Sequence, residues 1–224
     1  MKLIFVGDPM CSWCYGFGKE LAELQHAFPD TALQIVVGGL GAGATEPMTE
    51  GAWQFRFSNW SRVEAATGLP FNREGFRSFE NFVYDTEPAC RAVVAARLMA
   101  PAIGQLSVFR AIQHGFYANN LDITDGAVLA TLVAETMTRM GYRTTADAFL
   151  AVWQDPATVA ATREDFLHAR QWGISSFPAL LLQNGNELIQ VTTGYVGATE
   201  LRARVQTARD ASMQGTIAKR VQRS

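Results

Sequence analysis

The sequence contains few cysteines, no long apolar run and almost no net charge. Three cysteines in 224 residues are too few, and an odd number, for the disulfide framework of a secreted scaffold. No apolar stretch approaches the ~20 residues that a membrane-spanning helix needs, and Met1 leads into the first apolar segment with no signal peptide before it. A net charge of −2 argues against nucleic acid or an anionic membrane surface as a partner. We therefore expect a soluble, cytoplasmic protein that binds neither nucleic acid nor membrane.

Two of the three cysteines are close together, in the segment Asp8-Pro9-Met10-Cys11-Ser12-Trp13-Cys14. This segment follows the apolar run Leu3–Val6 and precedes a helical apolar pattern in residues 19–28. A Cys-x-x-Cys between a strand and a helix places the first thiol at the helix N-terminus, where unpaired N–H groups and the helix dipole favour a thiolate. We expect Cys11 to be the more exposed nucleophile, and Cys14 to be the buried thiol that resolves a mixed disulfide.

Two other interpretations of these thiols are half of a zinc site and a pair of inert buried thiols. A structural zinc site has four ligands, and the sequence leaves only Cys90 and three histidines without ligand spacing: His26, His114 and His168. Redox chemistry is therefore favoured, with no metal or organic cofactor. Cys90 stands among Ala and Val residues in a predicted helix, which favours a place in the core over a redox role.

Segments with strand character occur only toward the two ends of the chain. Leu3–Val6 and Leu33–Val37, with a helix between them, predict a βαβ unit whose strands are parallel. Ala179–Gln183 and Leu188–Thr192 are separated by Asn184-Gly185-Asn186, which predicts a β-hairpin. A final helix follows this hairpin.

The middle of the chain has helical patterns and almost no strand character. Helices are predicted over residues 89–99, 124–141, 146–153 and 157–172. The order βαβ, helices, ββα predicts an α/β thioredoxin fold, in which a mixed four-stranded sheet is flanked by helices. We expect this fold to be formed by residues 1–48 and 173–224, with residues 49–172 inserted as an all-helical domain.

Ser176-Phe177-Pro178 directly precedes the predicted strand at residue 179. Proline is tolerated at the first residue of a strand, so an ordinary trans proline is one interpretation. The other is a cis-Pro178 that turns the backbone of Phe177 toward the cysteines, and the Cys-x-x-Cys upstream favours it. The backbone of Phe177 would then offer strand-like hydrogen bonds to an extended peptide or to glutathione.

These two segments, residues 8–14 and 173–178, resemble the DsbA-like thioredoxin-fold family, and more narrowly its mostly cytoplasmic FrnE-like branch. The resemblance covers nearly the whole chain. It implies dithiol–disulfide exchange in which Cys11 attacks, Cys14 resolves and cis-Pro178 lies beside them. Substrate would bind at Phe177, Ser176, Trp13 and Met10. The dipeptide Ser-Trp between the cysteines replaces the Pro-His of DsbA, so Cys11 lacks one local positive charge.

The wider superfamily contains a second chemistry. Kappa-class glutathione transferases and 2-hydroxychromene-2-carboxylate isomerases use a serine to activate glutathione, whereas here Cys11 holds that position and a second cysteine follows. This favours a thiol–disulfide oxidoreductase, similar to a protein disulfide isomerase, whose partners are protein or peptide thiols and disulfides, with glutathione as a redox partner. The alternatives are a glutathione-dependent isomerase or transferase for a small aromatic substrate, and a chaperone without redox turnover.

Two further features are relevant to this site. Asp8 would disfavour a thiolate at Cys11 if the two were close, but a solvated turn residue is the favoured interpretation. Nine aromatic residues lie between Trp53 and Tyr84. We expect most of them in the core of the helical domain and a few in an apolar groove that faces the cysteines.

Overall fold

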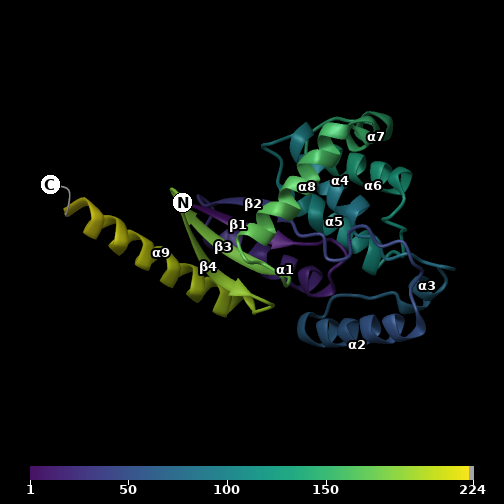
Figure 1. Ribbon diagram of the computed structural model, residues 1–224, viewed down its shortest axis with the longest axis horizontal. Coiled ribbons are helices and arrows are strands. Elements are labelled where there is room, and N and C mark those ends of the chain that lie inside the picture. Colours follow the sequence, from purple (N-terminus) through teal and green to yellow (C-terminus); the bar gives the residue numbers. More distant parts are fainter. Residues whose placement is uncertain (222–224) are drawn as a thin grey trace.

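The computed structural model describes residues 1–221, with side chains described through residue 213. Its strands are β1 (Lys2–Gly7), β2 (Ala32–Val37), β3 (Ala179–Asn184) and β4 (Glu187–Thr193), and they form one sheet in the order β2-β1-β3-β4 (Figure 1). β1 is parallel to β2 and antiparallel to β3, and β3 is antiparallel to β4. This is the mixed four-stranded sheet of the predicted thioredoxin fold.

The helices occupy the connections between the strands and the C-terminal end. They are α1 (Ser12–Ala27), α2 (Glu50–Thr67), α3 (Arg73–Arg77), α4 (Glu87–Met99), α5 (Gln105–Tyr117), α6 (Gly126–Arg139), α7 (Ala146–Gln154), α8 (Pro156–Gln171) and α9 (Ala198–Val221). Figure 1 shows α2 to α7 gathered at one end of the molecule, α8 crossing toward the sheet, and α9 extending away on the opposite side. The division into two domains, at residues 49 and 172, stays a prediction. None of the helices in the described part of the chain is both long and apolar enough to cross a membrane.

β1 is apolar and buried from Leu3 to Val6, as expected for a strand whose two faces are both covered. On one face, Phe5 packs against Phe17 of α1 and Phe109 of α5, with ring centroids 5.8 and 5.2 Å away. On the other face, Ile4 belongs to a second apolar cluster that includes Ala169 of α8. The central strand therefore holds the helices that follow β2 against the sheet.

The β-hairpin of β3 and β4 forms as predicted, but its loop contains only Gly185 and Asn186 rather than the three residues Asn184-Gly185-Asn186. Asn184 pairs with Glu187, which leaves two residues in the loop. Gly185 has a φ of 58°, and it is the first of these two residues. Glycine at that position is typical of a type II′ turn, whose twist matches that of the strands.

β2 is an edge strand, and side chains of the following helices cover its free backbone groups. The Ile35 N–H donates to Gln105 Oε1 (2.9 Å), and the Val37 N–H donates to Asp165 Oδ2 (3.0 Å). Arg97 donates to the Ile35 carbonyl at 2.7 Å and forms a bidentate pair with Asp165, with both N–O distances 2.9 Å. These contacts block the edge from pairing with another strand, and they fix α4 and α8 relative to the sheet.

Candidate active site

Cys11 is the N-cap residue of α1, with an extended backbone (φ −87°, ψ 114°). Its own N–H donates to the Asp8 carbonyl (3.0 Å), which closes the turn that follows β1. The unpaired N–H groups of the first helical turn and the positive end of the helix dipole lie at this position, and both favour an anionic sulfur. Cys11 is 7% exposed and Cys14 is fully buried, so Cys11 is the more accessible of the two thiols.

Cys14 lies in the first turn of α1, next to Cys11. Burial raises the pKa of the Cys14 thiol well above its ordinary value, and its contact with Cys11 raises this pKa further. A thiol in this environment stays protonated at neutral pH. The two sulfurs therefore have different environments, although they are one helical turn apart.

The second predicted segment lies directly beside the first. Phe177 and Pro178 are joined by a cis peptide bond, and the Cys11 thiol donates to the Phe177 carbonyl at 3.7 Å across a sequence separation of 166 residues. The Phe177 ring rests on Gly38, just after β2, where a Cβ atom would come within 2.1 Å of the ring. The approach of Phe177 to Cys11 thus depends on a glycine in a third segment.

A cavity of about 260 Å³ opens beside Cys11. All four residues predicted to bind substrate line it: Met10, Trp13, Ser176 and Phe177. The other lining residues besides Cys11 were not singled out from the sequence, although three of them belong to the aromatic group expected to face the cysteines in part. They are Ser12, Leu40, Phe55, Arg56, Asn59, Trp60, Tyr84 and Ser175. Cys14 and Pro178 lie behind this surface and are buried. Four of the missed residues come from α2, at spacings that share one helix face, and that pattern was the signal in the sequence.

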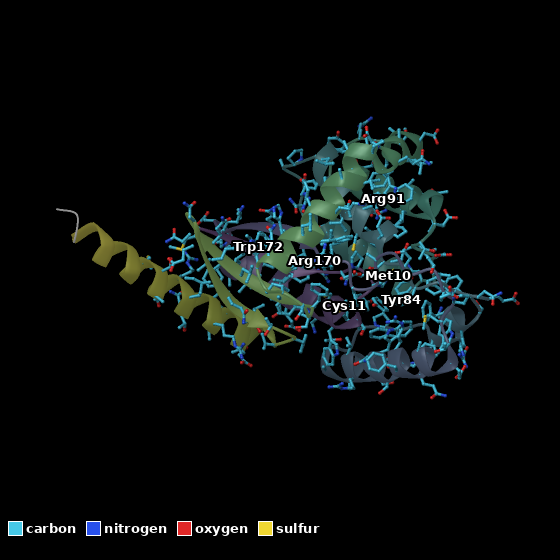
Figure 2. The ribbon with its side chains drawn as sticks, viewed as in Figure 1. Met10, Cys11, Tyr84, Arg91, Arg170 and Trp172 are labelled. Atoms are coloured by element: carbon cyan, nitrogen blue, oxygen red, sulfur yellow. The ribbon has the colours of Figure 1, made fainter. Side chains whose placement is uncertain are left out.

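The aromatic residues between Trp53 and Tyr84 divide between the core and the cavity. Phe55, Trp60 and Tyr84 line the cavity, and Figure 2 shows Tyr84 close to Met10 and Cys11 where α1 begins. Phe76 is fully buried, and its ring contacts those of Trp53 and Trp60, with centroids 4.8 and 4.9 Å away. One aromatic cluster therefore forms both the core against which α2 packs and part of the cavity wall.

Trp13 is held in place by three neighbours from other elements. Its Nε1–H donates to Asn59 Oδ1 of α2 at 3.4 Å. The ring lies 5.5 Å from that of Tyr195, which follows β4, and 5.3 Å from the Arg62 guanidinium. Trp13 thereby connects the first turn of α1 to α2 and to the segment that follows β4.

Tyr84 supports the loop from the opposite side. Its hydroxyl donates to the carbonyl of Met10, and burial raises the pKa of Tyr84, so that the hydroxyl keeps its proton. The guanidinium of Arg56 stacks on this ring, 3.3 Å from its centroid. Among the described residues that line the cavity, Arg56 is the only one with a basic side chain, and none is an aspartate or glutamate.

Asp8 is fully buried, so the expectation of a solvated turn residue is wrong. Its Oδ1 accepts from the Met10 N–H (2.8 Å), and its Oδ2 accepts from the Leu40 N–H (2.7 Å). These two hydrogen bonds therefore link the turn after β1 to the loop after β2. Burial raises the pKa of Asp8. The thiol of Cys90 also donates to Oδ2, at 3.4 Å, so this buried core cysteine contacts the residue that shapes the Cys11 turn.

In the described part of the chain, the fold does not bring a set of zinc ligands together around Cys11 and Cys14. Among the residues that the structure describes, no three His, Cys, Asp or Glu side chains are grouped as a metal site would require. What the geometry brings together is a thiol at a helix N-terminus, a buried second thiol, the peptide carbonyl of Phe177 and a cavity. Such an arrangement can hold a sulfur-bearing substrate next to Cys11.

Comparison with known proteins gives a consistent result. The chain matches the family model of the DSBA-like thioredoxin domain over residues 2–206. It is similar to a candidate protein disulfide isomerase from Nitrosomonas europaea, with 31% identity, a TM-score of 0.83, and coverage of 94% of this chain and 99% of that one. No curated protein gives a significant match.

Two other solved structures share the fold. The cytosolic disulfide reductase DsbM from Pseudomonas aeruginosa, solved with GSH, is 25% identical, with a TM-score of 0.70 and coverage of 94% and 100%. A 2-hydroxychromene-2-carboxylate isomerase is 13% identical, with a TM-score of 0.60 and coverage of 100% of both chains. These neighbours are consistent with the FrnE-like branch. The family match and the 31% identity show that the chain belongs to the DsbA-like thioredoxin family of thiol–disulfide oxidoreductases.

Proposed function

We propose that this protein is a thiol–disulfide oxidoreductase, similar to a protein disulfide isomerase, that exchanges disulfides through Cys11 and Cys14. The observation that carries the proposal is the difference between the two sulfurs. Cys11 is at the N-terminus of α1 and opens onto the cavity, whereas Cys14 is fully buried behind it with a raised pKa. A nucleophile must be reached by the substrate, whereas a resolving thiol acts from behind it, and this difference in exposure meets both needs.

In the reducing direction, the Cys11 thiolate attacks one sulfur of a substrate disulfide. A bond forms between Cys11 and that sulfur, and the other substrate sulfur leaves as a thiolate that takes up a proton. Cys14 then loses its proton and attacks the sulfur of Cys11, which releases the second substrate thiolate and forms the Cys11–Cys14 disulfide. Two electrons pass from the dithiol to the substrate, and the oxidising direction is the reverse of these steps.

The segment around cis-Pro178 would hold the substrate during exchange. The Phe177 carbonyl faces Cys11, and Ser176 is exposed at the edge of the cavity. An extended peptide beside Cys11 could donate a backbone N–H to such a carbonyl, as strand-like recognition requires. Glutathione is the proposed redox partner, since a similar disulfide reductase has been solved with GSH, and the cytoplasm is the proposed compartment.

The proposal is tested with an equilibrium redox titration of the purified protein in glutathione buffers, with alkylation and mass spectrometry to identify the oxidised residues. We expect one two-electron transition, assigned to a Cys11–Cys14 disulfide. The Cys14→Ser variant should accumulate mixed disulfides at Cys11, because the resolving thiol is absent. If no Cys11–Cys14 disulfide forms in any buffer, the proposal is wrong.

A second candidate function is a glutathione-dependent isomerase or transferase for a small aromatic substrate. The aromatic wall of the cavity, formed by Trp13, Trp60 and Tyr84, favours it. This chemistry needs glutathione to be activated at Cys11 and does not need a resolving thiol. The Cys14→Ser variant should then keep full activity on the small substrate, whereas the disulfide-exchange proposal predicts that it loses multiple-turnover exchange.

A further inference from the structure

The guanidinium of Arg56 has no counter-ion at the cavity. It stacks on the face of Tyr84, 3.3 Å from the ring centroid, and none of the residues that line the cavity is an aspartate or glutamate. The nearby carboxylate of Asp8 is fully buried and already accepts from the N–H groups of Met10 and Leu40. Arg56 thus brings a positive charge to the space next to Cys11 without a negative charge to balance it.

The hydrogen-bonding capacity of Arg56 is also unused. Its Nε is buried and has no hydrogen-bond partner among the described residues. A cation–π contact occupies the face of the guanidinium and leaves its edges free. Those edges carry N–H donors in a planar fork that matches a carboxylate. A buried donor without a partner costs free energy unless a ligand supplies an acceptor.

Asn59, the other side chain of α2 that could bind a carboxylate, is already engaged. Its Oδ1 accepts from the Trp13 indole at 3.4 Å, and its Nδ2 donates to the Phe55 carbonyl at 3.1 Å. Asn59 therefore holds Trp13 in place, and Arg56 is the only positively charged side chain among the described residues that line the cavity. The volume of about 260 Å³ is near the lower end of the ~300–1,000 Å³ typical of small-molecule sites, which suits a short thiol-bearing molecule.

We propose that Arg56 binds a carboxylate of the substrate while the substrate sulfur lies at Cys11, so that the site prefers small anionic thiols and disulfides, of which glutathione is the type. This inference rests on the proposed disulfide exchange and adds the substrate class to it. A carboxylate flanking a cysteine in a longer peptide has the same chemistry. Arg56 is a specificity-determining residue in this scheme, and Cys11 remains the reacting group.

The first experiment compares disulfides that differ in charge. The probes are glutathione disulfide, the disulfide of glutathione ethyl ester, and 2-hydroxyethyl disulfide. The measured quantity is the ratio of kcat/KM for glutathione disulfide to kcat/KM for 2-hydroxyethyl disulfide. We expect Arg56→Gln to lower this ratio about 10- to 100-fold, mainly through KM, because a charge-assisted hydrogen bond is lost. Arg56→Lys, which keeps the charge but not the fork, should lie between the two.

Arg202→Gln is the control for the loss of one positive charge, since Arg202 is exposed on α9 and does not line the cavity. It should keep the wild-type ratio. In the wild-type protein, the ethyl ester should lose much of the advantage of glutathione disulfide. A peptide disulfide with glutamate beside each cysteine, compared with its glutamine counterpart, shows whether longer acidic substrates use the same residue. If Arg56→Gln leaves the ratio unchanged, or lowers exchange equally for charged and neutral disulfides, the proposal is overturned.

A binding measurement separates this inference from the exchange reaction. S-methylglutathione has both carboxylates but no free thiol, so it cannot form a disulfide. Its Kd, measured by calorimetry with the reduced protein, should rise about tenfold or more in Arg56→Gln and stay constant in Arg202→Gln. Equal binding to wild type and Arg56→Gln would contradict the role of Arg56 even if disulfide exchange is confirmed. A loss of binding would support this role even if exchange is not found.

Discussion

The thiol of Cys90 lies 3.4 Å from Oδ2 of Asp8, so that a buried thiol donates to a buried carboxyl group directly behind the candidate active site. The remaining donors to Asp8 are the Met10 and Leu40 N–H groups and the Thr86 side chain. All of these partners are neutral, so hydrogen bonds alone compensate for the burial of the acid. Asp8 therefore connects the Cys11 turn, the loop after β2 and the start of α4.

The first prediction concerns the pH dependence of stability. Burial raises the pKa of Asp8 above its ordinary value of 3.8. Below that pH the carboxyl is protonated in both the folded and the unfolded chain. As the pH rises, the unfolded chain ionises first, which favours unfolding, so the contribution of Asp8 to stability is lost up to its raised pKa. The free energy of unfolding of wild type, minus that of Asp8→Asn, should therefore fall from pH 4 toward pH 7 in urea titrations.

Other titrating groups are shared by the two proteins and cancel in this difference. Asp30→Asn, at an exposed carboxyl, is the control for the loss of one charge. The free energy of unfolding of wild type, minus that of Asp8→Asn, could instead be constant or rise with pH. Either result would show that the carboxyl of Asp8 is ionised in the folded protein.

The second prediction concerns the order in which the thiols react. Cys11 is 7% exposed, whereas Cys14 and Cys90 are fully buried, and burial raises the pKa of both buried thiols. In the reduced protein at pH 7, iodoacetamide should modify Cys11 well before the other two, as peptide mass spectrometry would measure. In urea all three should react at similar rates. Equal labelling of Cys11 and Cys14 in the folded protein would argue against separate roles for them.

Much of the fold was predictable because its elements have local sequence signals. The apolar runs of β1 and β2, the glycine turn of the hairpin and the capped segments at α4, α6, α7 and α8 all appear as expected. The positions of α2, α3 and α5 were not predicted from the sequence. α2 has Gly, Ser, Asn and several aromatic residues, which have low helix propensity, and only Trp53, Trp60, Val63 and Thr67 of it are buried. Its helical state depends on packing against residues that are distant in the sequence.

The candidate site was predictable where residues share a motif, or where the family resemblance names them, as at Ser176, Phe177 and Pro178. Cys11 and Cys14 share a motif, whereas Arg56 reaches the same cavity from α2 and Tyr84 from the segment before α4. The burial of Asp8 depends on donors from Leu40 and Cys90. The contacts of Tyr84 and Asp8 follow from the tertiary fold, and a single sequence carries no signal for them, whereas the cavity residues of α2 share one helix face.

The third prediction concerns the ion pair at the edge of β2. The side chains of Arg97 and Asp165 are 18% and 7% exposed, and the pair is bidentate. Asp165→Asn would leave the positive charge of Arg97 partly buried and unpaired, which should cost about 3 kcal/mol of unfolding free energy. Glu135→Gln breaks a surface pair of α6 with Arg139 and should cost less than about 1 kcal/mol. Similar losses in the two variants, in urea titrations at one pH, would contradict the structural role of the edge pair.

The last prediction links a glycine outside the site to disulfide exchange. A Cβ atom at Gly38 would lie 2.1 Å from Cζ of Phe177, so Gly38→Ala must displace that ring. Because the carbonyl of Phe177 accepts from the Cys11 thiol, we expect the exchange rate with glutathione disulfide to fall roughly tenfold or more. Overpacking should also lower the free energy of unfolding by about 1–3 kcal/mol. Gly51→Ala, where no atom lies within 4 Å, should show neither effect.

A double-mutant cycle identifies the cause of this loss. In a Phe177→Ala background the ring is absent, so Gly38→Ala should cost little further stability and little further activity. The coupling between the two changes should then be nearly as large as the whole effect of Gly38→Ala in the wild-type protein. If Gly38→Ala has the same cost in both backgrounds, the clash with Phe177 is not its cause, and the exchange site does not depend on the contact between the loop after β2 and the segment at Pro178.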